Sequence, residues 1–92
     1  MPIRRIRRAV REGRFEFTLH ALDEMDEDDL TDADVRETIL RGRVAQTLRG
    51  DPRGLRFVVR GRAPARHDEV EVVCRFLPSR KMRIITVYRV ED

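Results

Sequence analysis

The chain has 92 residues, of which 40% are hydrophobic and 40% charged, with five glycines and four prolines. This composition is typical of one small globular domain over residues 1–92 and argues against a disordered chain. The sequence has no run of eighteen apolar residues and no apolar segment after its basic N-terminus, so we expect neither a membrane span nor a secretory signal. The single cysteine, Cys74, cannot form an internal disulfide or a zinc site, and we expect a buried structural thiol in a cytoplasmic protein.

Charge is segregated along the chain, although the formal net charge is only +3. Residues 4–14 contain six arginines and one glutamate, residues 23–34 are acidic without a basic residue, and residues 36–66 are basic again. Basic surfaces attract nucleic-acid phosphates, and arginine binds them in a bidentate manner. Because Lys81 is the only lysine, a bias in genome composition explains the arginines equally well. Both interpretations of the basic residues stay open.

The first predicted helix begins at Pro2 and ends at Gly13. Its apolar stripe consists of Ile3, Ile6 and Val10, and its opposite face carries the arginines. We interpret that face as solvated, with a dedicated binding surface as the alternative.

A short strand over residues 15–18 and a second helix over residues 19–27 follow. Thr31 is then expected to cap a third helix, with Asp34 completing a capping box and Gly42 ending the helix. The acidic residues between the helices lack the glycine and the distal glutamate of a calcium loop, so we predict no metal site and no cofactor.

The second half of the chain alternates between strands and turns. The expected strands are Val44–Leu48, Leu55–Arg60, Val70–Phe76 and Met82–Val90, with a loop over residues 61–68. Short connections make neighbouring strands antiparallel. The order helix, strand, helix, helix and four-strand meander predicts an α+β domain, with the helices on one face of a small antiparallel sheet.

The other sheet face is expected to be partly open and basic. Strand alternation places five arginines on it, together with four aliphatic residues: Arg56, Arg60, Arg75, Arg83 and Arg89, with Val58, Val73, Ile85 and Val87 between them. A purely solvated face would need fewer aliphatic residues, so this mixture indicates a surface that binds RNA or a protein partner.

Two side chains are candidates for acid–base chemistry. His20 follows the first strand, and Glu24 one helical turn later would hold it; a general acid or base and a structural bridge between strand and helix are both open. Alternation points Tyr88 toward the core, which favours a packed aromatic residue with a hydrogen-bonded hydroxyl. A tyrosine that acts on RNA is the alternative.

Several short motifs resemble a known family: Phe17-Thr18-Leu19-His20-Ala21, Met25, Leu30-Thr31, Asp34-Val35, Gly42 and Ile84-Ile85-Thr86-Val87-Tyr88. The element order resembles that of the RelE/ParE-like toxins, and the chain looks more closely like the bacterial family filed as domain of unknown function 4258. The resemblance covers residues 15–88. It implies a RelE-like fold and a toxin of a toxin–antitoxin pair that cleaves mRNA and binds an antitoxin protein.

The chain departs from that family at three positions. Glu24 and Asp28 stand where many members have arginine, and Glu71 stands where many have histidine. RNA cleavage needs a base, an acid and positive charge near the phosphate, which these carboxylates oppose. A non-catalytic interaction module of the same fold is therefore the second hypothesis. Its segregated charges would also allow copies to associate head to tail as a homo-oligomer.

Overall fold

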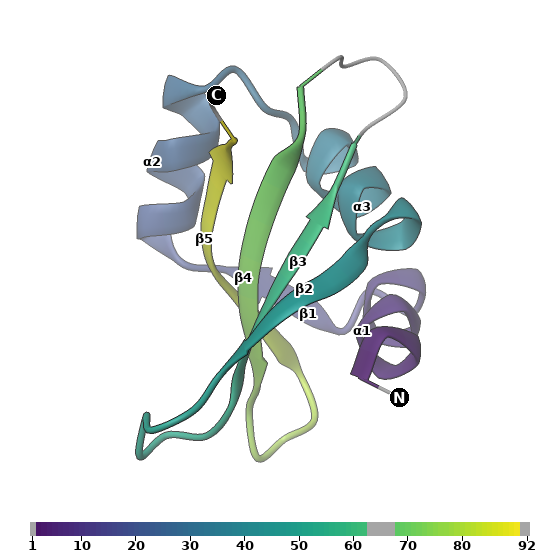
Figure 1. Ribbon diagram of the computed structural model, residues 1–92, viewed down its shortest axis with the longest axis vertical. Coiled ribbons are helices and arrows are strands. Elements are labelled where there is room, and N and C mark those ends of the chain that lie inside the picture. The colour runs from purple at the N-terminus through teal and green to yellow at the C-terminus, as the bar shows by residue number, and fades with distance from the viewer. Residues whose placement is uncertain (1, 63–67, 91–92) are drawn as a thin grey trace.

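The computed structural model describes residues 2–62 and 68–90 of the chain and has the predicted α+β class (Figure 1). Its elements are α1 (Pro2–Arg11), β1 (Phe15–Phe17), α2 (Leu19–Glu27), α3 (Asp32–Arg41), β2 (Arg43–Leu48), β3 (Arg56–Gly61), β4 (Val70–Phe76) and β5 (Met82–Arg89). The loop expected over residues 61–68 begins one residue later, because Gly61 belongs to β3, and residues 63–67 lie outside the described part.

The five strands form one sheet in the order β1-β5-β4-β3-β2. Strands β2 to β5 are the predicted antiparallel meander, with short connections between neighbours. The prediction of a wholly antiparallel sheet is wrong, however, because β1 pairs with β5 in parallel, from Phe15 opposite Met82 to Phe17 opposite Ile84. The chain leaves β1 through two helices and three strands before it returns, so a parallel pairing is sterically accessible.

All three helices contribute to one core against the sheet. Figure 1 shows α2 standing beside β5, with α1 and α3 on the other side of the view. Fully buried residues come from every layer, including Ile6 of α1, Ala21 of α2, Ile39 of α3 and Ile84 of β5. Cys74 is fully buried as predicted, and this burial raises the pKa of its thiol to about 12, which leaves it unreactive at neutral pH.

Two helix starts are capped by threonine. Thr31 and Asp34 form the predicted capping box of α3: the Thr31 N–H donates to Asp34 Oδ2 at 2.9 Å and the Asp34 N–H donates to Thr31 Oγ1 at 3.1 Å. Thr18, expected at the end of the first strand, is instead the cap of α2. Its hydroxyl accepts from the Ala21 N–H at 3.1 Å and donates to the Ile85 carbonyl at 2.9 Å, so it ties the start of α2 to β5.

The end of α3 lies directly on the backbone of β3. Gly42 ends the helix as predicted, but in an extended conformation with φ −90° rather than in the left-handed region. A Cβ at Gly42 would lie 2.6 Å from the carbonyl oxygens of Thr38 and Arg60, and one at Gly61 would lie 2.4 Å from that of Thr38. Glycine is needed at both positions because only hydrogen fits between the two backbones.

None of the helices in the described part of the chain is both long enough and apolar enough to cross a membrane.

Candidate functional site

A change of register between β4 and β5 decides which residues reach the open face, the sheet face opposite the core. Cys74 lies opposite Ile84, but Val73 lies opposite Thr86, so Ile85 is an extra residue in β5. Such a bulge reverses the alternation of side chains beyond it. Val87 is therefore fully buried in the core, whereas Thr86 precedes it on the opposite side of the strand.

This reversal corrects three predictions about β5. Tyr88 was expected to point inward, but it lies on the open face and is 37% exposed. Val87 was expected on the open face and is in the core. Arg89 was also expected there, but it lies opposite the core residue Val70 and therefore on the helix side of the sheet. Alternation predicts orientation only as far as the bulge.

Beyond the end of β1, carboxylates of α2 take the place of a neighbouring strand. Strand β1 pairs with β5 only as far as Ile84, which leaves later N–H groups of β5 without a strand partner. Glu24 Oε1 accepts from the Val87 N–H at 3.0 Å and from the Thr86 hydroxyl, and Asp28 Oδ2 accepts from the Arg89 N–H at 3.1 Å. Glu24 and Asp28 therefore hold α2 against β5.

His20 lies in the first turn of α2, next to that contact. Its Nε2 is 3.3 Å from Glu24 Oε1, as the sequence predicted, and the imidazole is 70% exposed. Because the same oxygen contacts Thr86 and Val87 of β5, His20 is linked through Glu24 to the sheet. The arrangement combines the structural bridge with the solvent access that an acid–base group requires.

A second set of polar side chains crosses the neighbouring strands in register. Tyr88 of β5 lies opposite Glu71 of β4, which lies opposite Arg60 of β3. The Tyr88 hydroxyl donates to Glu71, and this hydrogen bond, together with partial burial, raises the pKa of Tyr88 to about 12. Arg60 Nε is 2.6 Å from Glu69 Oε2 and 3.7 Å from Glu71 Oε2.

Together these side chains form a polar row that runs from α2 across β5 and β4 to β3. We define this row by its six members: His20, Glu24, Thr86, Tyr88, Glu71 and Arg60. It brings together the two catalytic candidates of the sequence. The sequence did not assign a role to Thr86. A threonine in a strand does not indicate by itself that its hydroxyl donates to Glu24, and this contact depends on the bulge at Ile85.

The other arginines predicted for the open face are paired with carboxylates. Asp51, in the turn between β2 and β3, lies 3.6 Å from Arg56 and 3.8 Å from Arg75. Hydrogen bonds from Arg53 contribute most to lowering the pKa of Asp51 to about 2. Arg83 is 3.2 Å from Glu16. Arg75 is itself buried, with only 7% of its surface exposed. The open face therefore presents paired charges rather than free arginines.

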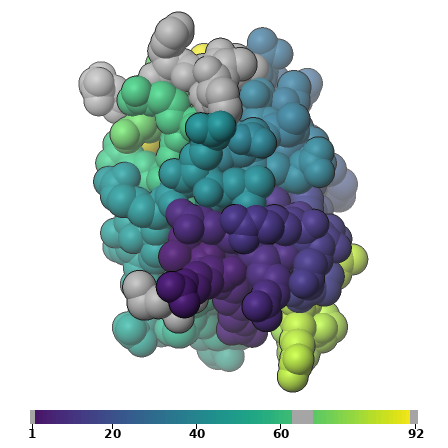
Figure 2. Space-filling view, turned by 90° about the vertical axis from the view of Figure 1, so that its right-hand side faces the viewer, coloured from purple at the N-terminus to yellow at the C-terminus, as the bar shows by residue number. Residues whose placement is uncertain are grey.

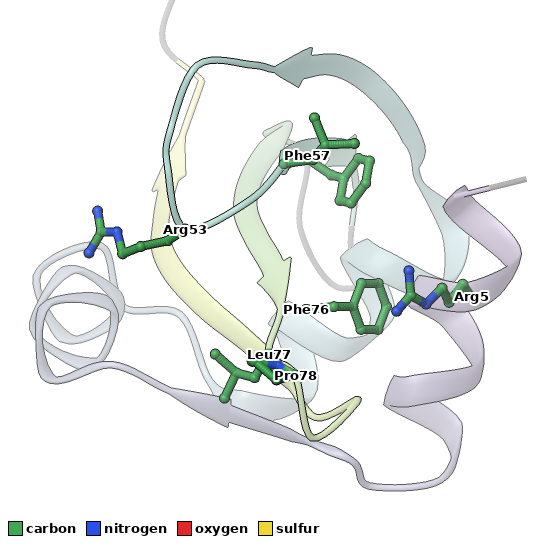
Figure 3. A pocket seen from close by; sticks show the side chains of 7 residues that line it. Arg5, Arg53, Phe57, Phe76, Leu77 and Pro78 are labelled. Atoms are coloured by element: carbon green, nitrogen blue, oxygen red, sulfur yellow. The ribbon is translucent and has the colours of Figure 1, made fainter.

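The described residues also contain an apolar pocket of about 360 Å³, away from the polar row (Figure 3). Its lining consists of Arg5, Arg53, Leu55, Phe57, Phe76, Leu77 and Pro78, without a carboxylate or histidine. The Arg5 guanidinium stacks on the Phe76 ring, 3.8 Å from its centroid. Among the described residues, 2–62 and 68–90, no group of three histidine, cysteine, aspartate or glutamate side chains is placed to hold a metal ion.

Comparison with known proteins identifies one family. The family described as Domain of unknown function (DUF4258) matches residues 17–89, which run from the last residue of β1 to the end of β5 and contain the whole polar row. The chain therefore belongs to this family. Neither the curated proteins nor the solved structures give a significant match. Helix α1 precedes the matched residues.

Proposed function

We propose that this member of the DUF4258 family is a RelE-like toxin of a toxin–antitoxin pair that cleaves mRNA in the cytoplasm. The observation that carries the proposal is the polar row. His20 and Tyr88, which are 68 residues apart in the sequence, lie along one solvent-facing line through Glu24 and Thr86. Acid–base groups arranged on an accessible sheet face fit a reaction on a long polymer, which a closed pocket could not admit.

The chemistry that fits these groups is attack of a ribose 2′-oxygen on the adjacent phosphorus. The new bond joins the 2′-oxygen to phosphorus and the bond from phosphorus to the 5′-oxygen breaks, leaving a 2′,3′-cyclic phosphate and a 5′-hydroxyl. The exposed imidazole of His20 would take the 2′-proton. Tyr88 is protonated at neutral pH, as a phenol is, so it would donate a proton to the departing 5′-oxygen. Arg60 would stabilise the charge on the phosphate.

An antitoxin segment that covers the open face would block this reaction. Substrate must reach Tyr88 and replace its hydrogen bond to Glu71, so any segment seated across β4 and β5 excludes RNA. A partner with basic side chains suits this position, since Glu24 and Glu71 belong to the row and Glu69 lies beside it.

The test is cleavage of a defined mRNA transcript by the purified protein, with mapping of the new ends, beside induced expression in a bacterial host. His20→Ala and Tyr88→Phe should each lower the cleavage rate by about 100-fold or more and relieve growth arrest. Leu19→Ala is the matched control, because Leu19 is 80% exposed and adjacent to His20. Intact transcript and unaffected growth with soluble parent protein would refute the proposal.

A specific observation favours a second candidate, a non-catalytic interaction module. The carboxylates in and beside the row already occupy its donors: Glu24 binds Thr86, Glu71 binds Tyr88, and Glu69 binds Arg60. A row with two carboxylates, and with Glu69 beside it, would bind a basic protein segment. The same induction experiment separates the candidates, since a module gives equal growth for the parent and His20→Ala. Its complex with a partner should weaken as salt increases.

A further inference from the structure

Helix α1 presents a basic surface, and none of its residues belongs to the polar row. We call it the α1 arginine surface and define it as the exposed side chains of Arg4, Arg5, Arg8 and Arg11, with Arg80 from the turn between β4 and β5. Figure 2 shows α1, in purple, lying across the face turned to the viewer, with the yellow-green β4–β5 turn beside its lower edge. The five arginines therefore belong to one side of the protein.

Two hollows along this surface share one lining residue. One, of about 470 Å³, is lined by Arg4, Arg7, Arg8, Arg11 and Glu12. The other, of about 380 Å³, is lined by Arg5, Arg8, Arg14, Phe76 and Arg80. Arg8 lies in both. The apolar pocket of Figure 3 adjoins the second hollow, because Arg5 and Phe76 line both of them.

The arginines of this surface lack the partners that the open-face arginines have. Glu12 is the one carboxylate that lines either hollow, and its Oε1 is held by Arg14 Nε at 2.7 Å. Within residues 2–62 and 68–90, no aspartate or glutamate forms an ion pair with any of the five side chains that define the surface. Their positive charge is therefore available to a ligand.

A purely structural role does not account for this arrangement. Arg4 and Arg8 are four residues apart, and Arg8 and Arg11 are three apart, so like charges repel along one helix face. The first turn of α1 contains no acidic residue, although Arg4 and Arg5 lie near the positive end of the helix dipole. The packing of α1 depends instead on Ile6, Ala9 and Val10. Arg4 and Arg5 therefore oppose helix stability, whereas Arg8 and Arg11 lie in the last turn, where positive charge complements the dipole. The dipole thus gives no reason for arginine at the start of the helix.

We propose that the α1 arginine surface binds the phosphodiester backbone of single-stranded RNA, and that the adjoining apolar pocket takes an unstacked base. Guanidinium groups pair with successive phosphates. The pocket offers Leu55, Leu77 and Pro78, beside the stack of Arg5 on Phe76, to a base that has left its own stack. Bases of a duplex are held in their stack and do not reach it. This binding is independent of the proposed cleavage, because neither the surface nor the pocket includes a residue of the polar row.

The experiment is fluorescence anisotropy with a labelled single-stranded RNA of mixed sequence, across a range of KCl concentrations. The protein carries His20→Ala throughout, so that a failure of binding and a failure of cleavage are distinguishable. Adding Arg4→Gln, Arg8→Gln and Arg11→Gln together should weaken binding by about tenfold or more. The slope of log affinity against log salt should fall by about 2, because each single-strand phosphate contact contributes about 0.7.

A second triple variant controls for net charge. Arg36, Arg41 and Arg62 are exposed but paired with Asp32, Glu37 and Glu69, at 2.6, 3.2 and 3.9 Å. Changing these three to glutamine removes the same charge and should weaken binding by less than about threefold. Equal losses for the two triple variants would overturn the proposal, because affinity would then follow net charge alone.

Further ligands test the choice of single-stranded RNA. A duplex of the same sequence should bind more weakly, and a poly-glutamate peptide of equal charge should displace the RNA poorly. Leu55→Ala should weaken RNA binding without changing the salt slope, since Leu55 lines the pocket and is 43% exposed. Absence of RNA binding, tighter binding of the duplex, or efficient displacement by poly-glutamate would each refute the assignment, the last by indicating an acidic protein partner.

Discussion

The first two helices carry charge of opposite sign and use it in opposite ways. Helix α1 contains five arginines and no carboxylate, and within the described residues only Arg7 donates a side-chain hydrogen bond, to the Gly42 carbonyl at 2.8 Å. Helix α2 is acidic, and Glu24 together with Asp28 at its end accepts backbone N–H groups of β5. The acidic residues stabilise the fold, whereas most of the arginines face outward.

The difference follows from what lies beside each helix. Strand β1 has only three residues, so β5 continues past it with N–H groups that need acceptors, and α2 lies alongside them. Helix α1 packs on α3 and the sheet through its apolar stripe. The Gly42 carbonyl accepts the hydrogen bond from Arg7 of this helix. The acidic run of α2 thus becomes a structural contact, and the basic run of α1 becomes a surface for ligands.

The largest effect on stability is expected from Glu24→Ala. This change leaves the Val87 N–H and the Thr86 hydroxyl without their acceptor and should lower the free energy of unfolding by about 2–3 kcal/mol. Asp28→Ala removes one such acceptor and should cost about half as much. Urea denaturation of the purified variants measures both.

Asp23→Ala is the matched control for that prediction, because Asp23 is exposed and lies beside Glu24 in the same turn. It should change stability by less than about 0.5 kcal/mol. Glu24→Gln keeps an acceptor oxygen and should recover part of the loss. If Glu24→Ala were as neutral as Asp23→Ala, the carboxylates of α2 would have no structural role and the contrast with α1 would not hold.

A smaller effect distinguishes two neighbouring arginines of α1. Arg7→Ala removes the hydrogen bond to Gly42 and should lower the free energy of unfolding by about 1 kcal/mol. Arg8→Ala should stay within about 0.5 kcal/mol, because Arg8 has no such bond and alanine favours the helix. The same denaturation experiment compares them. A larger loss for Arg8→Ala than for Arg7→Ala would show that the outward-facing arginines are structural after all.

The smallest effect at neutral pH is expected for the pair of Tyr88 and Glu71. The hydrogen bond and burial raise the folded pKa of Tyr88 from 10 to about 12, so the pair contributes its stability below pH 10 and loses it as pH rises toward 12. Titration of phenolate absorbance reports this group alone, since the chain has one tyrosine and no tryptophan.

Glu71→Gln should move the midpoint of that titration back toward 10, with Glu69→Gln as the control at the neighbouring carboxylate. A midpoint near 10 in the parent protein would mean that Glu71 does not hold the hydroxyl. Among the carboxylates that contact β5, only those of Glu24 and Asp28 would then act as acceptors.

Much of the candidate site could be anticipated from local sequence. The contact of His20 with Glu24 follows from their spacing of one helical turn, and the capping box of Thr31 and Asp34 follows from theirs. The pairing of Arg75 with Asp51 could not be anticipated, because it joins a strand to a distant turn. Contacts of that kind depend on how the hairpin of β2 and β3 folds over the sheet, which no residue spacing encodes.

The sequence by itself determined the kinds of elements, their order and the α+β class, because apolar periodicity, caps and turn residues act over a few neighbouring positions. Only the tertiary structure decided which way β5 faces beyond Ile85. The bulge exists because β4 and β5 pair with a change of register, and the single extra residue turned Tyr88 to solvent and Arg89 to the helices. Alternation is a property of one strand, but the position at which it reverses is a property of the pair.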